Sequence, residues 1–420
     1  MLRPGWIVYA LFVLNPIFWL LGLGAFIWSM ANVPLVAWAL LRQRLDRPPA
    51  VVPYTLYVMW AAFSVLRIDK ATRLLGFSLR FTAYAAALGL AYYVYNERRV
   101  SRERFINWVA MLWVWAIVGG YLGLIFPRGR LTVTPTSLIL PNSISRDEFV
   151  GNLVRPRFAQ IQNIFGVSIP RPSTLFAFTN EWGGAVGLLT PFFVAATLFS
   201  PNPRMRRVGI VGLVLAVPPI LLSVNRGLWL SVGAILIVVS IRSFMVGRTA
   251  PLKFLAIGIV LLAVTMVLTP IGAIVGGRLS DTDANARAGI YREAWQGAKA
   301  SPLLGWGGPR PSVNPFSPPV GTHGHIWTVM FSHGLVGLAL YLAFIVWALY
   351  KVSHARDPVS IMLASVVYVA SLQMFFYTMV PASLPIVLIA IGLLFRPDDQ
   401  PGAEAVSLSR VTQTRYDRVS

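Results

Sequence analysis

The sequence predicts an all-α, polytopic integral membrane protein, and three observations carry this prediction. Of the 420 residues, 56% are hydrophobic, and the mean hydropathy is +0.66. Only 12% of the residues are charged, which is about half the share of an ordinary soluble domain. Apolar runs recur from one end of the chain to the other, and many approach the ~20 residues that a helix needs to cross a bilayer.

The apolar runs divide into twelve predicted spans within one membrane domain, residues 1–396. Their approximate limits are 5–20, 24–41, 54–67, 75–95, 104–126, 182–200, 208–224, 228–246, 254–275, 325–350, 359–378 and 382–396. Residues 5–41 are interrupted only by Pro16 and a pair of glycines, so one span plus a re-entrant segment is the alternative there. The first run lacks a clean cleavage site, and we expect it to be retained rather than removed as a signal peptide. Residues 397–420 are polar and are expected to form a disordered cytoplasmic tail.

The basic residues predict the orientation of these spans. With twelve spans, both termini and five short basic clusters fall on one side, at residues 42–47, 98–104, 204–207, 242–253 and 351–356. The positive-inside rule makes this side cytoplasmic. One short loop with Arg67, Lys70 and Arg73 falls on the opposite side, which indicates either a topology error or a binding surface. Two long loops, residues 127–181 and 276–324, are then extracytoplasmic.

The net charge of +21 does not indicate a nucleic-acid-binding protein. The basic residues lie in short groups between apolar spans, where they act as orientation signals and contact anionic lipids. No motif of a DNA- or RNA-binding fold accompanies them. The chain has no cysteine, which excludes disulfides, thiolate metal sites and cysteine nucleophiles.

The second long loop contains a predicted helix at residues 284–300, with N-cap candidates just before it and Pro302 and Gly305 to end it. Arg287, Tyr291 and Trp295 recur at helical spacing and share one face. Such a helix is suited to lie along the membrane surface.

The strongest candidates for chemistry are the histidines that follow this helix. His323 and His325 lie where a loop rich in proline and glycine meets a long apolar run, and polar groups at such a position usually face a cavity or a partner. Histidine is mostly neutral near pH 7, so His323 suits a general base. His325 points about 200° away on a helix and is expected to be a helper or an N-terminal cap. Asp281 and Asp283 are available nearby, but the pair lacks a convincing third ligand, so no metal site is expected.

Arginines at the outer ends of spans are candidates for binding an anion, because guanidinium groups bind phosphate oxygens in a bidentate manner. Arg226 has no evident use as an orientation signal, although a snorkelling anchor is its alternative. Arg80 falls about five residues into the fourth span and needs an ion pair or a polar cavity. Arg171 and Arg287 are either ligands of the same anion or surface charges. Glu181 is an alternative base or a partner for one of these arginines.

Four segments match sequence patterns of one known family. They are S-V-N-R-G at 223–227, R-A-G-I-Y at 287–291, P-L-L-G-W-G at 302–307, and His323 followed by Gly334 and Gly337. A weaker fifth match runs from Arg171 to Asn180. In these patterns the chain resembles the O-antigen ligase and O-antigen polymerase superfamily, bacterial membrane glycosyltransferases with a GT-C-like helical fold, and it looks most like actinobacterial members. Tyr291 stands where the family pattern has Trp, and Gly324 stands where it has Asn.

The resemblance implies transfer of a glycan from a polyprenyl diphosphate, such as undecaprenyl diphosphate, to an acceptor hydroxyl on the outer face of the cytoplasmic (inner) membrane. It implies that His323 matches the functional histidine and that Arg226 and Arg287 match the functional arginines. It also implies a role in cell-envelope polysaccharide synthesis without a metal or nucleotide cofactor. The implied partners are the lipid-linked donor, a glycan or lipid acceptor, and membrane lipids.

Two other functions compete with a ligase. A polymerase would join the glycan to another carrier-linked repeat unit, and its sequence signals are much the same. A transporter of polysaccharide or lipid belongs to a different class, and transporters usually show repeated halves and ionisable groups at mid-membrane. No such repeat is evident here, and the candidate charges gather at the outer rim, which favours chemistry at the membrane surface.

Overall fold

The computed structural model is mostly helical and describes residues 3–141, 148–164, 167–253, 255–256, 258–259, 283–314 and 317–397. The helices of the N-terminal part are α1 (Trp6–Phe12), α2 (Asn15–Leu20), α3 (Ile27–Met30), α4 (Asn32–Leu40), α5 (Val52–Phe63), the 3-10 helix η1 (Ser64–Arg67), α6 (Ala71–Asn96), α7 (Arg102–Ile125), α8 (Pro135–Ile139) and α10 (Glu148–Val154). Those that follow are α11 (Thr179–Thr197), α12 (Pro203–Leu222), α13 (Arg226–Met245), α16 (Asp283–Ala300), α17 (His325–Val352), α18 (Pro358–Gln373) and α19 (Ser383–Leu394). Between α10 and α11 lie the strands β1 (Ala159–Ile164) and β2 (Val167–Pro172).

Within the described residues, five helices are long and apolar enough to cross a membrane. They are α6 from Arg73 onward, α7, α12, α13 and α17. Shorter apolar helices occupy three more predicted spans, namely the α3–α4 segment, α18 and α19. The prediction of a mostly helical membrane protein is thereby confirmed, whereas the count of twelve spans stays a prediction. The predicted span at residues 254–275 lies almost wholly outside the described residues.

The first 41 residues form four short helices instead of two continuous spans. Helix α1 ends at Phe12, and Pro16, which has no amide hydrogen to donate, lies at the start of α2. After α2 the chain turns at Gly22, whose φ is 79°. A Cβ at Gly22 would lie 2.5 Å from the hydroxyl of Thr134, so this turn packs tightly against the first long loop.

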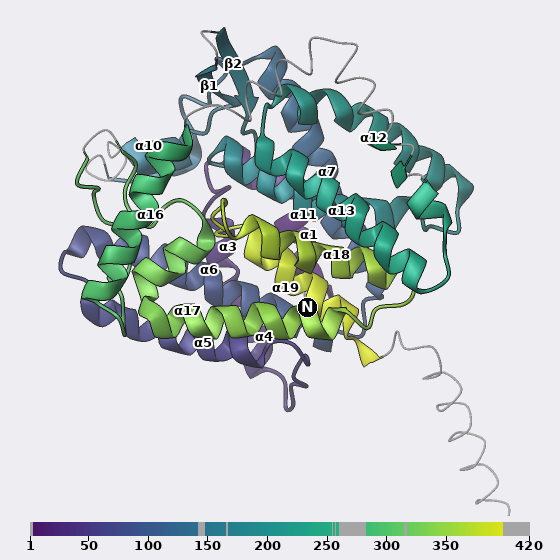
Figure 1. Ribbon diagram of the computed structural model, residues 1–420, viewed down its shortest axis with the longest axis horizontal. Coiled ribbons are helices and arrows are strands. Elements are labelled where there is room, and N and C mark those ends of the chain that lie inside the picture. The colour runs from purple at the N-terminus through teal and green to yellow at the C-terminus, as the bar shows by residue number, and fades with distance from the viewer. Residues whose placement is uncertain are drawn as a thin grey trace, which may run out of the picture.

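The helices pack in pairs around a buried centre. Helix α6 packs along α19, α7 along α11, and α5 along α17. Figure 1 shows α5 and α17 together at one edge of the molecule and α12 at another, with α13 between α12 and α18. Helix α19 is buried along nearly its whole length, whereas α12 exposes apolar side chains such as Val211 and Val214, as expected of a helix that faces lipid.

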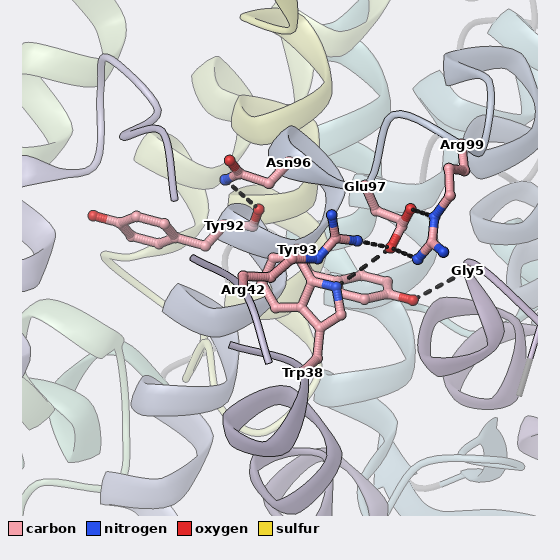
Figure 2. Close-up of polar contacts among 8 residues, drawn as sticks. All are labelled: Gly5, Trp38, Arg42, Tyr92, Tyr93, Asn96, Glu97 and Arg99. Atoms are coloured by element: carbon pink, nitrogen blue, oxygen red, sulfur yellow. Dashed lines mark hydrogen bonds and ion pairs between the residues drawn. The ribbon is translucent and has the colours of Figure 1, made fainter. Parts of the chain in front are cut away.

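At one end of the bundle, basic side chains surround the buried carboxylate of Glu97. It accepts hydrogen bonds from Arg42 at 2.6 Å, from two nitrogens of Arg99 at 2.7 and 2.8 Å, and from the Trp38 indole at 3.3 Å (Figure 2). On the same side of the bundle, Arg102 donates to the Ser360 hydroxyl at 2.9 Å. The predicted basic clusters at 42–47 and 98–104 therefore meet.

The fourth and fifth basic clusters also meet at this end. Arg242 donates to the carbonyl of Ala355 at 3.1 Å, and Arg248 donates to the carbonyl of Arg356 at 3.3 Å. These residues directly precede α18, whose start Arg102 contacts. Four of the five predicted clusters are thus linked by contacts, as expected if they lie on one membrane face. Which face this is stays a prediction.

The two long loops contain structure of their own. The predicted helix at 284–300 is confirmed as α16, and it packs beside the first part of α17 (Figure 1). The loop at 127–181 contains α8, α10 and an antiparallel hairpin in which Gln160 pairs with Arg171. The all-α prediction missed this hairpin, although the first strand, A-Q-I-Q-N-I, alternates apolar and polar residues as a half-buried strand does.

Candidate functional site

One cavity of about 510 Å³ gathers several predicted site residues at the end of the bundle opposite Glu97. Arg80 of α6, Glu181 of α11 and His323 of the loop before α17 all line it. Other polar side chains also line it, among them Gln160 of the hairpin and Tyr377 of the turn between α18 and α19. Segments far apart in the sequence therefore meet here, and apolar side chains complete the cavity wall.

Two hydrogen bonds define which nitrogen of His323 is basic. The Thr322 hydroxyl lies 2.9 Å from His323 Nδ1 and 2.6 Å from the carbonyl oxygen of Pro319. Since a carbonyl only accepts, the hydroxyl donates its one hydrogen to Pro319 and accepts from Nδ1. In the neutral ring Nε2 then carries the lone pair, which is the form that a general base requires.

The glycine after His323 explains one departure from the family pattern. Gly324 has a φ of 72°, and a Cβ at this position would lie 2.5 Å from the carbonyl oxygen of Phe375. An Asn would therefore collide with the turn that forms the opposite cavity wall. The backbone amide of the next residue, His325, donates to the carbonyl of Tyr377 at 2.8 Å, which holds the start of α17 against this turn.

Arg80 meets the requirement that the sequence set for it. Its guanidinium donates to the carbonyl of Gly76 at 3.0 Å, one turn earlier in α6, and lines the cavity. Among the described residues it has no carboxylate partner. Of the two environments that the sequence allowed for Arg80, an ion pair or a polar cavity, the structure contains the second.

Glu181 lies in the first turn of α11, just before the apolar part of the helix begins at Trp182. Its Oε2 accepts a hydrogen bond from the amide of Ala177 at 3.2 Å. Burial raises the pKa of this carboxyl to about 7, although the backbone amides of Ala177 and Phe178 oppose the shift. Glu181 therefore exchanges a proton near neutral pH, as a group that moves protons must.

Arg171 is buried beside the cavity and is bound to protein groups. It donates to the carbonyl of Ser223 at 3.1 Å, to Gln162 at 2.6 Å and to Asn180 at 3.4 Å. Asn180 itself lines the cavity. Arg171 thus joins the β-hairpin, the end of α12 and the start of α11.

The other two predicted arginines lie near the N-termini of helices. Arg226 is the first residue of α13, behind the N-cap Asn225, whose side chain bonds with the Thr179 carbonyl and the hydroxyl of Tyr377. This network connects the S-V-N-R-G segment to the cavity wall that contains Tyr377. Arg287 lies in α16, but its side chain is outside the described residues.

His325 faces a different environment from His323. It is fully buried, accepts a hydrogen bond from the amide of Met379 at 3.4 Å, and has its ring 5.0 Å from that of Tyr341. The two imidazoles of the H-x-H pair do not line one site, and within the described part of the chain no three His, Asp or Glu side chains form a group that holds a metal ion. His325 contacts the turn that carries Tyr377 and Met379, and its role as a helper stays a prediction.

Sequence reasoning missed three polar groups of this site. Thr322, Gln160 and Tyr377 were not candidates, although Thr322 directly precedes His323. Gln160 lies on the strand that the prediction missed, and its side-chain oxygen Oε1 accepts from the Thr179 backbone amide at 2.9 Å. Tyr377 had no signal at all, because an aromatic residue near a span end is ordinarily an interfacial anchor.

Comparison with known proteins adds one finding. The family model described as O-antigen ligase matches residues 211–342, a segment that includes Arg226, Arg287 and His323. Arg80, Arg171 and Glu181 lie outside the matched segment. No curated protein matches the chain. The match confirms the resemblance recognised in the sequence motifs, over the segment that contains four of the five motifs.

Proposed function

We propose that the protein is a glycosyltransferase that moves a glycan from a polyprenyl-diphosphate carrier to an acceptor hydroxyl, as an O-antigen ligase does. One observation carries the proposal: a single cavity is lined by a guanidinium (Arg80), a carboxyl that titrates near neutral pH (Glu181) and an imidazole whose Nε2 is basic (His323). Such a reaction needs an anion-binding group and a proton acceptor side by side.

In the proposed reaction, His323 Nε2 accepts the proton of the acceptor hydroxyl. The acceptor oxygen forms a bond with the anomeric carbon of the glycan, and the bond from that carbon to the diphosphate oxygen breaks. The departing diphosphate keeps the electron pair of that bond, and its negative charge is stabilised by Arg80, Arg226 and Arg287. Guanidinium groups suit this task because they stay charged and bind two oxygens at once.

The remaining predicted residues act through their neighbours. Arg171 positions Asn180 and the S-V-N-R-G turn, since its donors already contact Asn180, Gln162 and the Ser223 carbonyl. His325 holds the turn that carries Tyr377. Glu181 passes on the proton that His323 receives.

We also propose that the cavity opens on the extracytoplasmic side of the inner membrane, with both termini in the cytoplasm. This orientation is supported by the distance along α6 between Arg80 and the charged group around Glu97. Arg80 lines the cavity, whereas Glu97 and its arginines lie about 26 Å further along the helix at ~1.5 Å per residue. The basic clusters that orient a membrane protein thus lie at the far end from the cavity.

The proposal is tested by incubating the purified protein with a defined polyprenyl-diphosphate glycan and candidate acceptors and sizing the products. A single transferred block supports a ligase, and a ladder of products would instead make the protein a polymerase. Movement of the intact lipid-linked glycan across a vesicle membrane, without any new glycosidic bond, would contradict the proposal and identify a transporter.

A further inference from the structure

A second group of charged residues lies beside the cavity, where the turn between α5 and α6 meets the loop after α16. We call it the Trp306 clasp, and its members are Arg67, Asp69, Lys70, Arg73, Trp306 and Arg310. The proposed reaction assigns no role to it. It includes the one basic loop that fell opposite the other basic clusters in the sequence.

The indole of Trp306 is the centre of the clasp. The guanidinium of Arg310 lies 3.9 Å from its ring centroid, and that of Arg67 lies 5.1 Å from it. The indole nitrogen donates to the carbonyl of Gly297 at 2.9 Å, which fixes the ring against the end of α16. Two guanidinium groups thus contact one aromatic ring, an arrangement that cation–π attraction stabilises.

The clasp holds more positive charge than its own carboxylate neutralises. Asp69 pairs with Arg73 at 2.5 Å and with Arg310 at 2.7 Å, and the hydrogen bond from Arg73 lowers the pKa of this carboxyl. Arg67 and Lys70 have no ion-pair partner within the described residues. The clasp therefore has four cationic side chains and one carboxylate, which pairs with two of them, and the surplus charge favours an anion.

The two explanations that the sequence left for this loop can now be separated. A topology error would place the loop with the other basic clusters, near Glu97. Instead Arg73 donates to the carbonyls of Trp306 and Gly308 at 2.7 and 3.1 Å, and Gly308 lies close to Arg80 of the cavity. The loop lies at the cavity end of α6, so the binding surface is the explanation that remains.

Exposed apolar side chains border the clasp. Phe63, Leu66, Leu74, Leu75 and Leu303 are exposed by 56%, 73%, 44%, 46% and 62%. Apolar side chains next to Arg, Lys and Trp are typical of the membrane interface, where the apolar groups enter the hydrocarbon and the cations meet the headgroups. A soluble anion would require the cations but not this apolar border.

We infer that the Trp306 clasp binds the headgroup phosphate of an anionic phospholipid in the leaflet on the cavity side. The clasp is also connected to the segment that carries His323. Arg310 pairs through its backbone with Val320, at 3.3 and 2.8 Å, three residues before His323. The lipid site is separate from the proposed reaction, and its test does not depend on transfer.

The test compares thermal unfolding of the purified full chain in neutral detergent after adding phosphatidylglycerol or phosphatidylcholine. Phosphatidylglycerol is expected to raise the Tm of the wild type by several degrees, because a ligand of the folded state stabilises it. The variant Arg67→Gln/Arg310→Gln should keep less than half of this rise. The control Arg128→Gln/Arg157→Gln removes two exposed arginines of the other long loop and should keep all of it.

Three outcomes overturn the inference. They are an equal rise in the clasp variant and the wild type, an equal rise with phosphatidylcholine, and a rise with inorganic phosphate alone. A rise with polyprenyl diphosphate but not with phosphatidylglycerol would reassign the clasp to the donor. If the double variant does not fold, Lys70→Gln replaces it, since this side chain is exposed and forms no ion pair within the described residues, and it should lose part of the rise.

Discussion

Glu97 and Glu181 are two glutamates at helix ends on opposite sides of the bundle, and their surroundings differ in kind. Glu97 is 1% exposed and accepts hydrogen bonds from two arginines and a tryptophan (Figure 2). Glu181 lines a cavity, and its side chain accepts from the backbone amide of Ala177. The first carboxylate is surrounded by donors, whereas the second faces a space that a ligand can fill.

The protonation of the two groups differs accordingly. Burial alone would raise the pKa of Glu97, but the hydrogen bonds from Arg99 and the charge of Arg42 outweigh it, so this pKa is lowered. At Glu181 burial prevails and raises the pKa to about 7. Neutralised charge at one end of the bundle therefore stabilises the structure, whereas an ionisable group that faces the cavity at the other end is available for chemistry.

Among changes at the two ends of the bundle, we expect the largest effect from His323→Ala at the cavity end, which should lose transfer. Removing a general base typically costs about 10²–10⁴-fold in rate. We expect that loss with the Tm unchanged within about one degree, because the side chain is at a cavity surface and not in the core. The measurement is initial transfer rate with a purified lipid-linked donor, alongside thermal unfolding.

His354→Ala is the matched control, since His354 is an exposed histidine at the other end of α17 and bonds only locally with Tyr350 and Ser353. It should keep the wild-type rate. If His323→Ala also keeps that rate, the imidazole is not part of the mechanism.

The second prediction concerns Glu97, at the end of the bundle opposite the cavity. Glu97→Gln leaves Arg42 and Arg99 without their carboxylate and should destabilise the protein by about 2–3 kcal/mol. This is below the cost of breaking a fully buried pair because the side chains of Arg42 and Arg99 are 32% and 63% exposed. Transfer per folded molecule should stay at the wild-type level. The check is denaturant or thermal unfolding combined with an activity assay of the folded fraction.

Asp46→Asn provides the comparison for this variant. Asp46 pairs with Arg98 at 3.2 Å, but both side chains are exposed, so its loss should cost less than about 1 kcal/mol. An equal loss of stability in the two variants would mean that burial of Glu97 does not matter.

The sequence predicted the parts of this protein that depend on local pattern. Long apolar runs marked α6, α7, α12, α13 and α17, because a bilayer demands a continuous apolar helix of a certain length. The helix α16 was predictable from its cap residues and from the proline and glycine that follow it. The division of residues 6–40 into the four short helices α1–α4 was indicated in the sequence only by Pro16 and the glycine pair.

The sequence identified individual residues of the site, but it did not show which of them line the same cavity. His323, Arg80 and Glu181 stood out because each is a polar group at the edge of an apolar run. Nothing in the sequence indicated that these three line one cavity, since that depends on how α6, α11 and the loop before α17 pack. Tyr377 shows the same limit, because its contact with Asn225 joins residues more than a hundred positions apart.

The third prediction sharpens the role of the arginines at the cavity end. Arg226→Lys keeps the positive charge but loses the bidentate fork, so transfer should fall by about tenfold, mainly in the rate of the bound complex. Arg206→Lys, an exposed arginine of α12 near the other end of the bundle, should have no effect. The measurement is kcat and KM with the lipid-linked donor. Wild-type turnover in Arg226→Lys would make this residue a membrane anchor.

The smallest expected effect is the contribution of Glu181 to the pH dependence of the protein's stability. The sign of this pH dependence should be opposite to that at Glu97. Because the pKa of Glu181 in the folded protein lies above its usual value of 4.5, the native state binds this proton more tightly than the unfolded chain does. The stabilisation that this bound proton gives the folded protein is fully present below about pH 4.5 and is lost as the pH rises through about 7. Glu181→Gln should therefore match the wild type in Tm at pH 5 and exceed it at pH 8.

Glu97→Gln should behave in the opposite way. The pKa of Glu97 is lowered in the folded protein, so its stabilisation is present above its usual pKa and is lost only as the pH falls through the lowered value. The Tm deficit of Glu97→Gln should be full at pH 8 and shrink on acidification, while the Tm gain of Glu181→Gln appears only on the alkaline side. The same pH trend in both variants would mean that the two carboxyls have equivalent surroundings, and the assignment of Glu181 to proton exchange in the cavity would then fail.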